Sequence, residues 1–315
     1  MIFYVQVLLL TLCTCVLTIS SLWLLIGLLG QISLCHAAIS AVGAYASAIC
    51  SMALIRFSHK ASSSCALAFL CVLIGALAGG IAGFLSGLPA AKLKKEHITL
   101  STLAFGEILK SIIINTPYLG GEGFSHGSAG QSLIGIPPIV GTVFTLCITI
   151  LCLLFLAYIK KSPFGRACRA VRDDEAAARS IGLHPARIKI LAFCLSGVVA
   201  GISGCLFAHG IGTLAPGSFS YVKSTEYVMF CVPAGDSLLL SVFSGAVCAF
   251  LPALLSPLGK HRMLFYSLGI LIFILYKAKK GHPHEKQNRS SCTKLKRQFW
   301  RCASSQKRFF FRFPK

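Results

Sequence analysis

Residues 65–88 read CALAFLCVLIGALAGGIAGFLSGL, a stretch of 24 residues without a charged side chain. A helix needs about 20 mostly apolar residues to cross a bilayer, so this stretch predicts a transmembrane helix. Its glycines at Gly75, Gly79, Gly83 and Gly87 recur at a spacing that lets helix backbones approach closely. We therefore expect a membrane helix that packs against other helices.

Similar apolar stretches extend this prediction to most of the chain. They cover residues 2–29, 32–54, 98–114, 139–159, 190–207, 227–255 and 263–276. The composition agrees, since 55% of the residues are hydrophobic and 12% are charged, against about 25% charged residues in soluble domains. We predict an all-α fold, a polytopic transmembrane helix bundle of about eight to ten spans. The first stretch lacks the basic residues and the cleavage site of a signal peptide and is expected to be a retained helix.

The stretch 227–255 is expected to be broken, because Pro233 to Ser237 interrupt it. It is short for two full crossings, so we predict two short or tilted helices, or a re-entrant pair, packed against protein. A single crossing would also put the strongly basic C-terminal tail outside the cell, against the rule that basic segments stay in the cytoplasm.

The excess of basic residues indicates the orientation. The chain has 30 Lys and Arg against 9 Asp and Glu; eight basic residues lie in the loop 160–189 and 13 lie in residues 277–315. We predict a transmembrane domain over 1–276 with a cytoplasmic loop at 160–189, an outside N-terminus, and a disordered, basic cytoplasmic tail over 277–315. Anionic lipid and topology explain the charge, so no nucleic-acid partner is expected. No cysteine or histidine spacing suggests a metal site.

Within the loop 160–189, the pattern predicts one short helix. Asp173, Asp174 and Glu175 precede Ala176 to Ala178, and acidic residues are favourable at a helix N-terminus. Gly182 is a typical helix stop, and Pro185 follows it.

Five ordered stretches resemble one family. Residues 27–38 read GLLGQISLCHAA and are followed by GAY at 43–45. The other four are TLSTLAFGEILK at 99–110, GGEG to GIPP at 120–138, GRACRAVR to AAARSIG at 165–182, and AH to STE at 208–226. Together they resemble the permease subunits of branched-chain amino acid ABC transporters, over about residues 20–276.

The resemblance implies a bacterial inner-membrane permease that moves branched-chain, small hydrophobic amino acids by alternating access. The implied partners are a second permease subunit, two cytoplasmic ATPase subunits, a periplasmic or extracytoplasmic substrate-binding protein and the lipid bilayer. The chain has no G-x-x-x-x-G-K-[ST] motif, so ATP binding and hydrolysis belong to the partner subunits. We expect a transport subunit that is no enzyme and needs no cofactor of its own.

The resemblance also implies two groups of site residues. The ATPase-coupling loop is expected to use Arg166, Arg169, Arg172, Glu175, Ala177, Ala178 and Gly182. The substrate-pathway candidates are Gln31, His36, Glu107, Glu226 and Gly235.

The residue chemistry refines this second group. Glu107 and Lys110 are three apart and can pair on one helix face, as a structural pair or as part of the pathway. His36 is expected to be a hydrogen-bonded packing histidine. Glu226 precedes the stretch at 227 and is expected near the interface.

Two departures and two alternatives remain open. Residues 234–246 keep few of the glycines that the family has at this turn, and they add the charge of Asp236. Cys35 stands where the family usually has glycine. If the glycines form a tight turn, these changes leave the substrate preference or the transport competence open. The same scaffold could import urea or another small amide. A self-contained proton-coupled carrier would instead use Glu107 or Asp236 to carry the transported charge.

Overall fold

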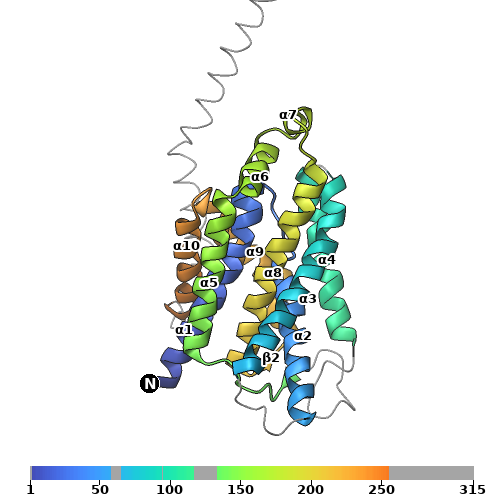
Figure 1. The fold of residues 1–315 in the computed structure, drawn as a ribbon. Coiled ribbons are helices and arrows are strands. Elements are labelled where there is room, and N and C mark those ends of the chain that lie inside the picture. Colours follow the sequence, from blue (N-terminus) through green and yellow to red (C-terminus); the bar gives the residue numbers. More distant parts are fainter. Residues whose placement is uncertain (1, 58–64, 94, 117–132, 255–315) are drawn as a thin grey trace, which may run out of the picture. The chain divides into compact units, whose positions relative to one another are not determined.

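The structure is a computed structural model that describes residues 2–57, 65–93, 95–116 and 133–254 (Figure 1). Among these residues, six helices are long and apolar enough to cross a membrane. They are α1 (Ile2–Trp23, continued by the π-helix η1, Leu24–Leu29), α2 (His36–Phe57), α3 (Cys65–Lys92), α4 (Lys95–Asn115), α5 (Thr142–Lys161) and α8 (Pro185–Ile211). The predicted all-helical membrane bundle is confirmed.

The shorter elements lie at the two ends of these helices. Between α5 and α8 come α6 (Pro163–Asp173) and α7 (Glu175–Ser180). We call this end of the bundle, where Figure 1 shows α6 and α7 together, the basic end. At the other end, β1 (Leu133–Ile134) pairs antiparallel with β2 (Thr213–Leu214), and we call it the hairpin end.

The predicted break between residues 227 and 255 is confirmed. The chain forms η3 (Pro216–Phe219), α9 (Tyr221–Cys231), the 3-10 turn η4 (Val232–Ala234) and α10 (Leu238–Leu254). One detail of the prediction is wrong: α9 begins at Tyr221, so Glu226 lies inside a helix and does not precede it. The predicted span at 263–276, the basic tail and most of the loop between α4 and β1 lie outside the described residues.

Close backbone packing holds α8 against α3. A Cβ atom added to Gly79 would lie 2.4 Å from the carbonyl oxygen of Gly197, and one added to Gly83 would lie 2.5 Å from that of Phe193. Only glycine fits at such contacts, as the regular glycine spacing in α3 predicts. The contact between Gly43 and Gly201 brings α2 against α8 in the same way.

The connection between η1 and α2 carries the chain from the basic end to the middle of the bundle. Gly30 ends η1 in the left-handed conformation, with φ of 69°. His36 then begins α2 beside Ser196, about halfway along α8, and Cys35 contacts Gly106, about halfway along α4. A helix N-terminus is thereby placed halfway across the bundle, where the candidate site lies.

Candidate functional site

Two short capped helices form the candidate coupling loop at the basic end. Ser162 caps α6, because its hydroxyl accepts a hydrogen bond from the Gly165 amide at 3.2 Å. Asp174 caps α7 by accepting bonds from the amides of Ala176 and Ala177 at 2.8 and 3.1 Å. The predicted short helix is α7, whereas α6 was not predicted.

The end of α7 also follows the prediction. Gly182 has φ of 85°, a conformation that favours glycine, just after the last turn of α7. Pro185, expected only to stop a helix, in addition begins α8.

An ion pair fixes α7 to α8. Glu175 accepts a hydrogen bond from the Lys189 ammonium at 3.0 Å and a second from Arg179 at 2.9 Å. Lys189 is only 1% exposed. Burial raises the pKa of the Glu175 carboxyl, but the two cations together outweigh burial and hold that pKa below its ordinary value. Glu175 therefore stays ionised and neutralises a buried ammonium group.

The arginines expected to meet an ATPase differ in their surroundings. Arg166 is exposed and donates to the Lys161 carbonyl at 3.1 Å. Arg169 folds back and donates to the Lys160 carbonyl at 2.9 Å, and Arg172 donates to the Gly27 carbonyl of η1. Arg169 and Arg172 therefore hold α6 against the bundle.

The surface that α7 leaves open is small and partly apolar. Ala176 and Ala177 are exposed, and Ala178 is buried against the bundle. Ile181, next to Gly182, is 72% exposed, which is unusual for a large aliphatic side chain beside charged residues. The sequence analysis did not single out Ile181, although its position directly before the helix stop was a signal for it.

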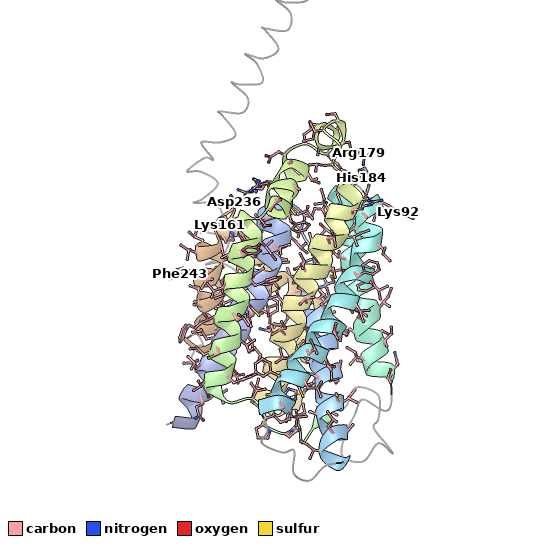
Figure 2. The ribbon with its side chains drawn as sticks, in the orientation of Figure 1. Lys92, Lys161, Arg179, His184, Asp236 and Phe243 are labelled. Atoms are coloured by element: carbon pink, nitrogen blue, oxygen red, sulfur yellow. The ribbon has the colours of Figure 1, made fainter. Side chains whose placement is uncertain are left out.

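The turn between α9 and α10 belongs to this end of the bundle. The Lys160 ammonium donates to the Asp236 carbonyl at 2.8 Å, and the Asp236 carboxylate lies 3.6 Å from the Arg172 guanidinium. A Cβ atom on Gly27 would lie 2.7 Å from the Gly235 carbonyl oxygen. Gly235, a candidate for the substrate pathway, lies beside the coupling loop. Figure 2 shows Asp236 at the same end as Arg179.

Two pathway candidates, Gln31 and His36, are buried inside the bundle. Ser196 donates to the Ser21 carbonyl at 2.6 Å and lies 2.8 Å from His36 Nε2, so it accepts a hydrogen bond from that nitrogen. His36 is therefore hydrogen-bonded, as expected, and its place in the pathway stays a prediction. Gln31 is 1% exposed, and its side-chain amide has no hydrogen-bond partner among the described residues.

The other two pathway candidates, Glu107 and Glu226, form ion pairs on neighbouring elements. Glu107 lies 3.6 Å from Lys110 on α4, as the spacing predicted. Glu226 lies 2.7 Å from Lys223 on α9. Glu107 also lies near Ser224 of α9, because both residues line the same depression. Across the described residues, no group of three His, Cys, Asp or Glu side chains could hold a metal ion.

Known proteins with similar sequences agree with this architecture. The family "Branched-chain amino acid transport system / permease component" matches residues 4–276. The high-affinity branched-chain amino acid transport permeases LivM of Salmonella typhimurium and Escherichia coli are each 27% identical over 283 residues, or 79% of this chain and 63% of theirs. The autoinducer 2 import permease LsrC of Escherichia coli is 31% identical over 166 residues, or 52% of this chain and 47% of its own.

The chain thus spans less than two thirds of the length of these relatives. No solved structure matches it. The family match runs from residue 4, within α1, past the end of α10 and includes both α6–α7 and the α9–α10 break. The chain is a multi-pass membrane protein and belongs to the branched-chain amino acid permease family of ABC importers.

Proposed function

We propose that this chain is the permease subunit of an importer for branched-chain and other small hydrophobic amino acids, working by alternating access. Separate ATPase subunits supply the energy. The family match and the LivM relatives support the substrate class. The observation that carries the proposal is the α6–α7 unit, a short element that projects from the basic end and is held firmly to the bundle.

The α6–α7 unit has the properties of an ATPase-docking element. Movement of a docked ATPase reaches the membrane helices only if the projecting element is stiff, and the Glu175–Lys189 pair ties α7 to α8. Arg172 ties α6 to η1. The exposed Ala177 and Ile181 offer a small, partly apolar contact surface for a protein partner.

The charge distribution supports an orientation with the basic end in the cytoplasm. Lys160, Lys161 and the arginines of α6 and α7 gather at this end, and short basic loops stay cytoplasmic. The N-terminus of α1 then lies on the outside. The outward faces of α3 and α5 carry large apolar side chains suited to lipid, among them Phe69, Leu73 and Leu154.

A complete importer of this kind consists of two permease subunits, two ATPase subunits on the cytoplasmic side and an extracytoplasmic binding protein. We place it in a bacterial inner membrane, where hydrolysis of ATP by the partners opens the permease pair alternately to each side.

Co-purification in detergent tests the docking assignment. We expect Ala177→Arg and Ile181→Glu to reduce recovery of the ATPase subunit strongly, since both place a charge on the contact surface. Gly217→Glu at the hairpin end is the matched control, because a Cβ atom there meets nothing within 4 Å. ATPase recovery that is equal in all three variants would refute docking on α7.

The similarity to LsrC favours a second candidate substrate, while the proposed transport role stays the same. LsrC is a permease of an autoinducer 2 import system, so related scaffolds serve different solutes. Competition of leucine uptake by an excess of urea or of an uncharged polyol measures this alternative directly.

A further inference from the structure

Two charged side chains, Glu107 and Lys110, lie in the second half of α4. Glu107 is 43% exposed and Lys110 is 24% exposed, although both lie within an apolar membrane helix. Lys223 of α9, which contacts α4, is 45% exposed. Ionisable groups in membrane segments face protein or a water-filled cavity because burial in lipid costs several kcal/mol. The face formed by α4 and α9 is therefore open to water or to substrate.

Two adjoining depressions lie at this face. One is shallow and is lined by Ala38, Ala41, Tyr45, Lys110, Ile113, Pro216 and Phe219. The other is equally shallow and is lined by Leu34, Ala38, Leu103, Gly106, Glu107, Phe219, Tyr221 and Ser224. They share Ala38 and Phe219, so a continuous apolar floor carries an ammonium group on one side and a carboxylate on the other.

Two helix N-termini also approach this floor. α2 begins at His36 and α9 begins at Tyr221, and the Ser224 hydroxyl accepts a hydrogen bond from the Ala37 amide at 3.1 Å. Glu107 and Lys110 offer partners for both charges of a zwitterion beside this apolar surface.

We propose that this face binds a small zwitterionic amino acid halfway across the membrane. The ammonium group of the ligand contacts Glu107, its carboxylate contacts Lys110, and its aliphatic side chain lies on Ala38 and Phe219. When a zwitterion binds, the Glu107–Lys110 ion pair is replaced by two ion pairs, one between each of these residues and the ligand, so no charge is left without a partner. An uncharged solute cannot make this exchange.

The inference rests on the proposed function and narrows it to ligands that carry both charges. The second permease subunit of the importer would close that face.

Direct binding tests the site. The probe is radiolabelled L-leucine bound to the purified permease–ATPase complex in detergent, with the binding protein left out so that only the membrane site reports. We expect 3-methylbutylamine, which lacks the carboxylate, and 4-methylpentanoate, which lacks the ammonium group, to compete at least about 10-fold more weakly than L-valine. Competition by either analogue equal to that of L-valine overturns the proposal.

Matched variants separate binding from folding. Glu107→Gln, Lys110→Met and Ala38→Val are each expected to weaken leucine binding about 10-fold or more. The controls Lys92→Met and Ala66→Val make the same chemical changes at exposed positions of α3 that line neither depression, and they are expected to bind normally.

A charge swap, Glu107→Lys with Lys110→Glu, keeps an ion pair on α4 while reversing its direction. We expect normal yield of the complex and weakened binding, because a carboxylate then stands where the ligand carboxylate should lie. Normal leucine binding in the swap and in both single charge variants overturns the site. If the ATPase still co-purifies in that case, the permease function stands; if the wild-type chain recovers no ATPase, the permease function itself fails.

Discussion

Replacing Glu175 by Gln removes the negative charge that pairs with Lys189. The ammonium group of Lys189 is 1% exposed, and its contact with Glu175 is 3.0 Å. The variant keeps the shape of the side chain and leaves a buried cation without a counter-charge. We expect α7 to loosen from α8 and the whole bundle to lose stability.

The expected loss is about 3 kcal/mol. Breaking a buried ion pair from one side costs about 3–5 kcal/mol, because the remaining charge is uncompensated. Glu175 is 29% exposed, so water reduces the cost toward the lower end of that range. Removing both charges, in Glu175→Gln with Lys189→Met, should recover more than half of the loss, since an apolar pair needs no neutralisation.

Unfolding in mixed detergent micelles by a titration with SDS, followed by circular dichroism, measures these changes. The matched control is Arg179→Gln, which removes the exposed partner of the same carboxylate and should change stability by less than about 0.5 kcal/mol. If Glu175→Gln and Arg179→Gln destabilise equally, or if the double variant is the least stable of the three, the buried pair does not hold α7.

Three further outcomes follow. The pKa of Glu175 is lower in the folded state than in the unfolded state. The stabilisation from the ionised carboxylate is therefore present above the unfolded pKa and is lost as pH falls through the folded pKa. In acid titrations, the difference in free energy of unfolding between wild type and Glu175→Gln should be constant from pH 7 to 6 and become smaller below about pH 4.3. Gly79→Ala should destabilise by about 1–3 kcal/mol, because its Cβ atom would lie 2.4 Å from the Gly197 carbonyl, whereas Gly217→Ala should be neutral; equal melting curves would contradict the α3–α8 packing. Asp236→Asn should change stability by less than about 1 kcal/mol, since the Asp236–Arg172 pair is partly exposed, and a larger loss in the SDS titration would contradict this.

The helices that could be predicted from the sequence are those whose signal is local. Apolar runs such as 65–88 identify their own spans, and Asp174 and Gly182 mark the ends of α7 by capping and by left-handed backbone geometry. The break near Gly235 was equally visible, because proline and glycine interrupt an otherwise apolar stretch.

The contacts that group these elements depend on residues distant in the sequence. Arg172 donates to the carbonyl of Gly27, and Lys160 donates to that of Asp236. A local sequence pattern cannot predict a backbone acceptor that is so distant in the sequence from its donor. The position of Gly235 at the basic end, beside Gly27, was for this reason not predicted. The start of α9 was missed because the stretch was identified by its apolar run, which begins only after the charged residues Lys223 and Glu226.

The contacts of the pathway candidates were also predictable only where they are local in the sequence. Spacing alone predicted the Glu107–Lys110 pair, since both residues lie on one helix. Whether that pair faces lipid, protein or water depends on how α2, η3 and α9 meet α4, which is a tertiary property.

Uptake by the reconstituted importer tests the central claim most directly. Proteoliposomes containing this permease, its partner permease and the ATPase subunits, with ATP inside and the binding protein outside, are supplied with radiolabelled L-leucine. We predict uptake that requires ATP and is unchanged by a protonophore. Leucine uptake that follows a proton gradient without ATP, or ATP-driven uptake of urea with no uptake of leucine, would contradict the account.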